Sequence, residues 1–206
     1  ARGWLEAGRE LPVAVNVSPR TVVDPTFPRR LAGLLDEYGV PAHLVTLEIR
    51  EQGLLGETER SLANVRRLAD LGVRLAVDDF GTGHASLTHL RRMPLHEVKI
   101  DRSIIAGIAT DDGDLATVRA VVLLADQLGL VSVAEGVENE RTVNLLEELG
   151  CGVGQGFLFS RALPYERFEA WLAAQPEPAP VLEPRGEVTV LEPRADGEGR
   201  WLRVVP

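Results

Sequence analysis

Polar side chains stand at the ends of six apolar segments, and their types could support metal-dependent chemistry. They are Asn16, Glu48 with Glu51, Asp78 with Asp79, Lys99 with Asp101, Glu135 with Glu138, and Gln155. Like charges that lie a few ångströms apart raise each other's pKa or require a cation. Oxygen ligands suit hard divalent ions such as Mg²⁺ and Mn²⁺. Four or five of them could hold two metals, the arrangement used to cleave phosphodiesters.

Each of these residues taken alone also has a structural explanation. Asp101 fits the cap of a following turn, Lys99 could snorkel or pair with a carboxylate, and Asn16 could form an Asx turn. Six strands that all end in this way are harder to explain by local capping, so a shared site is favoured. A zinc site is not expected, because no histidine or cysteine is among the residues at the strand ends. The histidines are His43, His84, His89 and His96.

The apolar segments that carry these residues predict buried strands, because they are rich in Val, Ile and Leu. They span residues 11–18, 44–51, 73–80, 96–103, 130–137 and 152–160. Amphipathic helical patterns lie between most of them and after the last. These patterns span residues 24–39, 57–72, 114–129, 138–150 and 163–174. Strand and helix in alternation predict parallel strands with crossover helices, in either an open doubly wound sheet or a closed barrel.

The first helical pattern carries the most complete signals. Asp24 is expected to be its N-cap, Pro25 its first residue and Gly39 its stop. Its apolar stripe is expected to face the core. The stripe consists of Phe27, Leu31, Leu34, Leu35 and Tyr38.

Two observations favour the barrel over the open sheet. No G-x-G-x-x-G sequence follows the first strand, which weakens the dinucleotide-binding alternative. Asn16 and Glu48 are 32 residues apart and Glu48 and Asp78 are 30 apart, about one barrel unit each. In such barrels the strand ends converge on one mouth, where active sites lie. About six βα units of the eight in a barrel are recognisable in this sequence.

The motifs together resemble those of the EAL domain, a bacterial family of cyclic-di-GMP phosphodiesterases. The resemblance covers about residues 1–174, through "VAVNVS", "LEIRE", "VDDFGTG", "VKID", "VAEGVE" and "GQGFLFS". It implies an α/β fold, a TIM-like (β/α)8 barrel of EAL type. It also implies hydrolysis of cyclic-di-GMP to linear pGpG with two Mg²⁺ or Mn²⁺ ions, and inhibition by Ca²⁺.

The resemblance further implies a role for each motif residue. The implied metal ligands are Asn16, Glu48, Asp78 as the bridging ligand, Asp79 and Glu135. Lys99 resembles the lysine that orients the attacking water and offsets phosphate charge, and Glu135 and Glu138 are implied in catalysis. The implied supporting residues are Glu51, Gly81, Gly83 and Gln155. Glu51 would steady the loop at 80–87, which the family associates with substrate binding and dimer contact.

The sequence also departs from the family pattern. The Glu-Ala-Leu signature lies upstream of "VNVS" in the family and is not within these 206 residues, so this chain alone is predicted to be incomplete for catalysis. Arg50 stands where the family usually has Thr, and we expect it to face away from the mouth. His84 and Ala85 replace commoner residues in the loop, and His84 is expected to tune the loop rather than to act in catalysis.

Composition sets limits on partners and location. The net charge of −9 argues against binding a nucleic acid polymer, and no stretch is long and apolar enough for a membrane span. The single cysteine, Cys151, excludes an internal disulfide and fits a cytoplasmic location. The family implies cyclic-di-GMP as ligand and a homodimer. A sensory or diguanylate-cyclase-like domain upstream would fit the family, and such a segment could anchor the parent protein to a membrane.

Residues 1–174 are therefore predicted to form the EAL domain without its N-terminal strands. Residues 175–186 are expected to be a Pro- and Glu-rich linker, and residues 187–206 a β-hairpin tail. Two alternatives to the enzyme remain: a non-catalytic cyclic-di-GMP receptor or scaffold, and an unrelated metal-dependent barrel. The retained ligand set favours the enzyme, because degenerate EAL domains usually lose ligands.

Overall fold

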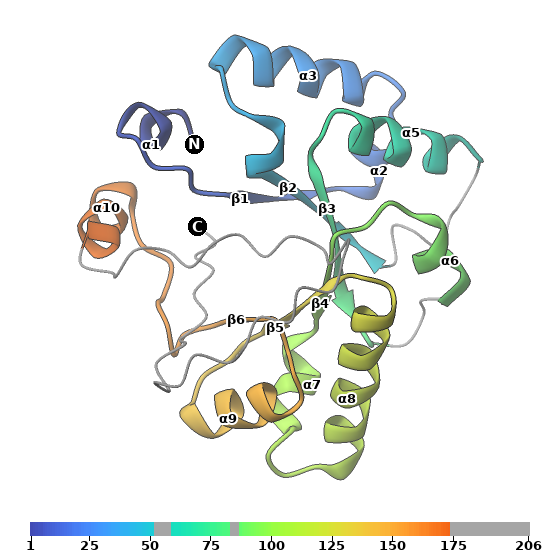
Figure 1. Ribbon diagram of the computed structural model, residues 1–206, viewed down its shortest axis with the longest axis vertical. Coiled ribbons are helices and arrows are strands. Elements are labelled where there is room, and N and C mark those ends of the chain that lie inside the picture. Colours follow the sequence, from blue (N-terminus) through green and yellow to red (C-terminus); the bar gives the residue numbers. More distant parts are fainter. Residues whose placement is uncertain (52–58, 83–86, 174–206) are drawn as a thin grey trace. The chain divides into compact units, whose positions relative to one another are not determined.

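The structure is a computed structural model that describes residues 1–51, 59–82 and 87–173 (Figure 1). The chain divides into two compact units, Ala1–Lys99 and Ile100–Pro206, and each is described by itself. The predicted linker and tail at 175–206 lie outside the described residues.

The first unit alternates strands and helices. Its strands are β1 (Val13–Val17), β2 (Val45–Arg50), β3 (Arg74–Phe80) and, except for its last residue, β4 (Glu97–Ile100). Its helices are α1 (Arg2–Glu6), α2 (Pro19–Val23), α3 (Phe27–Tyr38), the 3₁₀ turn η1 (Ala42–Leu44), α5 (Glu59–Asp70) and α6 (Leu87–Arg92). β1 pairs with β2 and β2 with β3, both in parallel, so neighbours in the chain are neighbours in the sheet.

The second unit continues the same alternation. Its elements are α7 (Arg102–Gly107), α8 (Asp112–Gln127), β5 (Val131–Glu135), α9 (Glu140–Glu148), β6 (Val153–Gln155) and α10 (Tyr165–Ala173). β5 and β6 pair in parallel. All six predicted strands are thus present in the described residues, each followed by helix, which confirms the expected six βα units.

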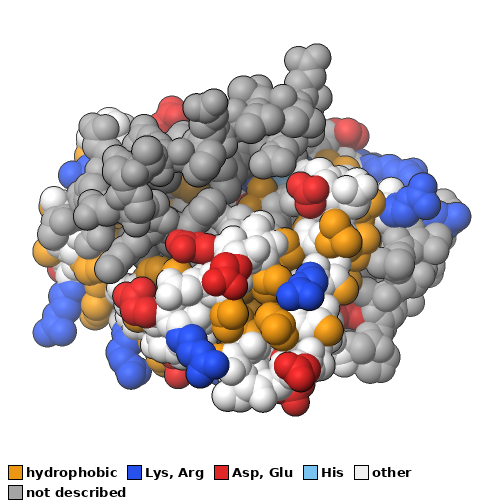
Figure 2. All heavy atoms as spheres, turned by 60° about the horizontal axis from the view of Figure 1, so that its bottom comes forward, with side chains coloured by type: hydrophobic (Ala, Val, Ile, Leu, Met, Phe, Trp, Pro, Cys, Tyr) orange, Lys and Arg blue, Asp and Glu red, His pale blue; other side chains and the backbone are white. Residues whose placement is uncertain are grey.

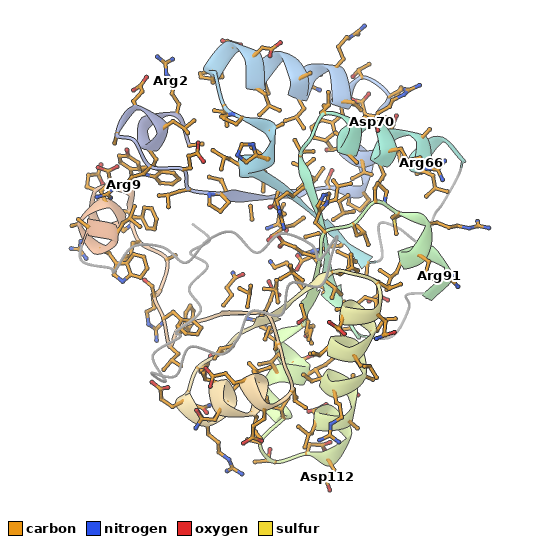
Figure 3. The ribbon with its side chains drawn as sticks, viewed as in Figure 1. Arg2, Arg9, Arg66, Asp70, Arg91 and Asp112 are labelled. Carbon is orange, nitrogen blue, oxygen red and sulfur yellow. The ribbon has the colours of Figure 1, made fainter. Side chains whose placement is uncertain are left out.

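β2, β3 and β4 are largely buried, as their unbroken apolar runs predict. β1 differs, because Val15 and Asn16 are exposed. Leu75, Ala76 and Val77 are consecutive in β3 and all three are fully buried. α5 buries Leu62, Val65 and Leu68. The opposite side of α5 carries charged residues, including Arg66 and Asp70, which point outward in Figure 3. This amphipathic pattern fixes which face of α5 packs inward.

The predicted start of the helix at 24–39 is wrong. α3 begins at Phe27 and its N-cap is Thr26, whose side chain makes no capping bond. Asp24 instead accepts hydrogen bonds from the backbone N–H and the hydroxyl of Thr26, at 2.9 and 2.8 Å. This Asx turn competes with a cap for the same carboxylate, because a short polar side chain reaches its own backbone two residues on. Gly39 ends the helix with φ 60°, as predicted.

The predicted apolar stripe of α3 is only partly buried. Leu34 and Tyr38 are 51% and 49% exposed, while Phe27, Leu31 and Leu35 are half-buried. Periodicity shows which residues share a helix face, but it does not show how completely another element covers that face.

Three helices of the second unit, α7, α8 and α9, have conventional N-caps. The carboxylate of Asp111 accepts from the N–H groups of Gly113 and Asp114 at the start of α8. Asn139 accepts from the N–H of Thr142 at the start of α9, at 2.9 Å. Asp101 caps α7 by accepting from the N–H of Ser103 at 2.7 Å, which confirms the structural explanation of this acid.

The visible surface mixes charges of both signs. In Figure 2 acidic and basic side chains are scattered among hydrophobic ones on the face that is shown. None of the described helices combines the length and the apolar character that crossing a bilayer requires.

Candidate metal centre

Lys99, Glu48 and Asp78 form a buried charged cluster in the first unit. The Lys99 ammonium nitrogen lies 2.8 Å from Oε1 of Glu48 and 3.6 Å from Oδ1 of Asp78. The three residues are only 2%, 2% and 7% exposed. β4 supplies the lysine, β2 the glutamate and β3 the aspartate. Three strands that are adjacent along the chain therefore deliver these groups to one point.

The strand register explains why Asn16 and Glu48 belong to the same surface. Asn16 of β1 is the direct partner of Glu48 in β2, and Glu48 is the direct partner of Ala76 in β3. Asp78 follows Ala76 by two residues, and side chains two apart on a strand share a face. Asn16, Glu48 and Asp78 therefore project from one face of the sheet. Asn16 is exposed, whereas the two acids are buried.

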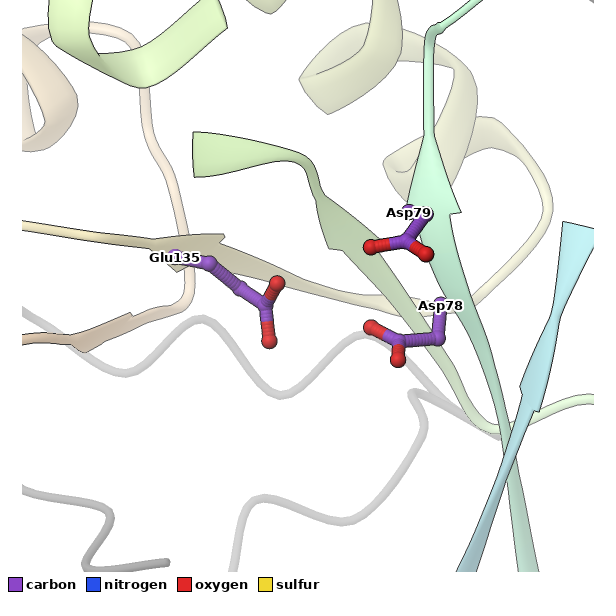
Figure 4. Close-up of side chains that lie close together, drawn as sticks. All are labelled: Asp78, Asp79 and Glu135. Atoms are coloured by element: carbon purple, nitrogen blue, oxygen red, sulfur yellow. The ribbon is translucent and has the colours of Figure 1, made fainter. Parts of the chain in front are cut away.

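Asp79 lies beside Asp78 because the backbone departs from regular strand geometry there. Its φ is 57°, and it is the only non-glycine residue with positive φ in the part of the chain that the structure describes. Strict alternation would send neighbouring side chains to opposite faces. Instead both carboxylates extend to the same side (Figure 4), with oxygens within 4.8 Å of each other. An outlying φ of this kind is typical of functional sites, and Asp tolerates it better than most residues.

Arg50 approaches the acidic pair, contrary to expectation. Its Nε lies 3.3 Å from Oδ2 of Asp79, and Arg50 is the register partner of Asp78. The prediction that Arg50 faces away from the mouth is therefore wrong. The signal was in the sequence: Arg50 follows Glu48 by two residues, and period-two alternation puts both on one face.

The other described first-unit residues predicted for the site, Glu51 and Gly81, follow the ends of β2 and β3. Glu51 directly follows β2 and is only 3% exposed. Gly81 has φ 100° in the turn after β3, where the hydroxyl of Thr82 donates to the backbone carbonyl of Asp79 at 3.1 Å. Gly83, His84 and the next two loop residues, 85–86, lie outside the described residues.

In the second unit, the structure brings Glu135 and Gln155 together. They are register partners at the C-terminal ends of β5 and β6, and both are half-buried. Figure 4 labels Glu135 where β5 ends. The carbonyl of Gln155 accepts from the N–H of Val137 at 2.9 Å, which ties the two strand ends together. Glu138 is exposed in the segment between β5 and α9.

The donor set of the first unit fits a hard divalent cation. Oε1 of Glu48 and Oδ1 of Asp78 are buried and receive no well-directed hydrogen bond from the described residues, although Lys99 is within ion-pair distance. Buried acceptors normally have a donor or a metal. Oxygen donors from carboxylates and an amide are those that Mg²⁺ and Mn²⁺ prefer. Asn16, Glu48, Asp78 and Asp79 are the residues that could hold such an ion.

Comparison with known proteins identifies the family. Residues 1–162 match the family model of the EAL domain. The chain belongs to the EAL domain family. RocR of Pseudomonas aeruginosa, named a cyclic di-GMP phosphodiesterase, is 37% identical over 167 residues, which cover 81% of this chain and 43% of RocR. The EAL chain spans 22% and 43% of the lengths of two curated relatives that it matches.

Solved structures agree with this assignment. The solved structure of the PaMucR phosphodiesterase in complex with c-di-GMP has a TM-score of 0.78 at 37% identity, and the match covers 81% of this chain and 68% of the solved chain. The manganese and cy-diGMP complex of Klebsiella pneumoniae BlrP1 has a TM-score of 0.71 at 31% identity, covering 77% and 41% of the two chains. These similarities confirm the predicted α/β fold class, the TIM-like barrel of the EAL domain.

Proposed function

We propose that this EAL domain hydrolyses cyclic-di-GMP to linear pGpG with two bound Mg²⁺ or Mn²⁺ ions, and that Ca²⁺ inhibits it. The observation that carries the proposal is the buried cluster of Lys99, Glu48 and Asp78, in which two carboxylate oxygens receive no well-directed hydrogen bond from the residues that the structure describes. Relatives named cyclic di-GMP phosphodiesterases and a solved manganese complex support the choice of substrate and ion.

The first-unit residues would divide the work between ion binding and charge control. Asn16, Glu48, Asp78 and Asp79 would hold the ions. When bound, such ions supply an acidified water and neutralise phosphate oxygens. In the hydrolysis one P–O bond of the ring breaks, while water gives its hydroxyl to phosphorus and its proton to the leaving oxygen.

Lys99 would act on the reacting phosphate. Its ammonium is a compact point charge with three donors, suited to orient a water and to offset charge on a phosphate oxygen. Its contacts with Glu48 and Asp78 hold it at the end of the strands. Lysine is expensive to bury unless it is paired. The two carboxylates therefore offset the cost of its burial and hold it in position.

For the remaining predicted residues, the proposal assigns roles by family resemblance. Glu135 is proposed as a further metal ligand, and Glu138 as a catalytic residue. Gln155, Glu51, Gly81 and Gly83 are proposed to support substrate and loop. The position of Glu135 at the end of a parallel strand, opposite Gln155, supports a role at the strand ends.

We further propose that the domain forms a homodimer and works in the cytoplasm, linked to a sensory or diguanylate-cyclase-like domain. The family resemblance supports these statements, and light scattering on the full protein that carries this chain would test the dimer. Residues 1–174 are proposed as the EAL domain, followed by the linker at 175–186 and the tail.

The test is an assay of that full protein with cyclic-di-GMP and Mn²⁺, in which chromatography separates pGpG. Asp78→Asn should reduce turnover by at least about a hundredfold, because it removes a ligand charge that no other group replaces. Asp70→Asn, the same change on the outward face of α5, should leave turnover unchanged. Tight binding of cyclic-di-GMP without turnover in the unaltered protein would instead support the receptor alternative. Near-normal turnover in Asp78→Asn would contradict the two-metal proposal.

A further inference from the structure

Arg50 places a second positive charge at the acidic end of the first-unit strands. Its Nε is 3.3 Å from Oδ2 of Asp79, and the two side chains are 67% and 40% exposed. Arg50 is also the register neighbour of Asp78. It therefore shares a face with the carboxylates but remains in contact with solvent, unlike the buried Lys99.

The Arg50 guanidinium is paired with the Asp79 carboxylate, which a divalent ion would need as a ligand. Glu48, Asp78 and Asp79 carry three negative charges when ionised, and Lys99 and Arg50 carry two positive charges. An ion that binds Asp79 meets repulsion from the guanidinium and must share the carboxylate or lengthen its contact with Arg50. Arginine keeps its charge throughout the working pH range, so the competition does not depend on protonation.

We propose that Arg50 lowers the affinity of this site for Mg²⁺ and Mn²⁺ by competing with the ion for Asp79. This inference rests on the proposed function, which places an ion at Asp79. Because the ion pair is largely exposed, solvent and salt screen it. The expected effect is therefore about three- to tenfold in the dissociation constant of the metal.

A purely structural role for Arg50 predicts the opposite result. Asp79 has φ 57°, and an ion pair that held the residue in this conformation would prepare it for the metal. Loss of Arg50 would then weaken metal binding. The direction of the change therefore separates a competitor from a positioning residue.

The experiment is calorimetric titration of Mn²⁺ into the full chain and three variants. Arg50→Gln should bind Mn²⁺ about three- to tenfold more tightly, because the competing charge is gone. Arg50→Lys keeps the charge and should stay within about twofold of the unaltered chain. Arg66→Gln removes the same charge from the outward face of α5 and should change nothing. The gain in Arg50→Gln should shrink at high ionic strength, since the pair is exposed.

The outcomes separate this inference from the proposed function. Mn²⁺ binding that is unchanged or weaker in Arg50→Gln overturns the competition and leaves the two-metal proposal standing. Mn²⁺ binding that is detected in Arg50→Gln but not in the unaltered chain supports the competition. If neither the unaltered chain nor Arg50→Gln binds Mn²⁺, both the competition and the metal site are overturned.

Discussion

The ammonium nitrogen of Lys99 lies 2.8 Å from Oε1 of Glu48, and both side chains are almost fully buried. Asp78, 3.6 Å from the same nitrogen, adds a second carboxylate. One positive charge thus faces two negative charges in a region of low dielectric, where uncompensated charge is costly. The cluster is balanced only when further positive charge arrives, which suits it to metal ions.

Replacement of Lys99 by Met should destabilise the metal-free protein by about 3–5 kcal/mol, because two buried carboxylates lose their partner. Added Mn²⁺ should restore more stability to this variant than to the unaltered chain, because the ion substitutes for the lost charge. Thermal unfolding with and without Mn²⁺ measures both effects. Glu97→Gln, which breaks the buried pair between Arg74 and Glu97 at the other end of β3 and β4, is the matched control. A similar rescue of Glu97→Gln by Mn²⁺ would contradict the prediction.

Replacement of Asp101 by Ala should cost about 1 kcal/mol of stability, because α7 loses its N-cap. Its affinity for Mn²⁺ should be unchanged, since Asp101 is bonded to Ser103 through both the backbone N–H and the hydroxyl. Denaturant unfolding measures the loss of stability, and Mn²⁺ titration measures the metal affinity. A loss of Mn²⁺ affinity would show that Asp101 is more than a cap.

Replacement of Gly156 by Ala should destabilise the second unit by about 1–3 kcal/mol through overpacking. A Cβ at this position would collide with the backbone carbonyl oxygen and nitrogen of Val137, and backbone atoms cannot yield as a flexible side chain can. Val137 bonds the carbonyl of Gln155, so the strain reaches the end of β6 directly. Thermal unfolding measures the loss, and Gly33→Ala, where a Cβ meets nothing within 4 Å, is the control. Equal stability of the two variants would argue against this close approach.

Burial raises the pKa of the Cys151 thiol above its ordinary 9.0, which predicts slow modification at pH 8. The folded state holds this proton to higher pH than the unfolded state does. Its contribution to stability is therefore complete below about pH 9 and is lost as the pH rises through the folded pKa. Labelling with a thiol reagent should be slow in the native protein and fast in denaturant. Rapid labelling of the native chain at pH 8 would contradict this assignment, and Cys151→Ala should lose the part of the alkaline dependence that comes from this thiol.

The strands and the acidic strand ends were predictable from the sequence because both follow simple periods. Unbroken apolar runs marked β2 and β3, and the spacing of Asn16, Glu48 and Asp78 matched one βα unit each. The register then brought Asn16 and Glu48 into direct apposition.

Conformations set by local competition were not predictable in this way. Asp24 accepts a hydrogen bond from Thr26 instead of capping the helix. The left-handed backbone of Asp79 cannot be predicted from hydrophobic periodicity. The contact between Arg50 and Asp79 has one predictable cause and one that is not predictable. Strand alternation brings Arg50 to the face that carries Glu48, whereas the left-handed backbone of Asp79 turns its carboxylate toward Arg50.

The parallel register between β1, β2 and β3 has a consequence for insertions and deletions. A single residue added inside β2 would turn every later side chain of that strand to the opposite face, so an insertion before Glu48 would aim it away from Asn16 and Asp78. The connection between β2 and β3 carries no such constraint on parity. Variation in length across related domains should therefore concentrate between strands. Variants with longer or shorter loops should retain metal binding, whereas variants with one residue added inside a strand should lose it.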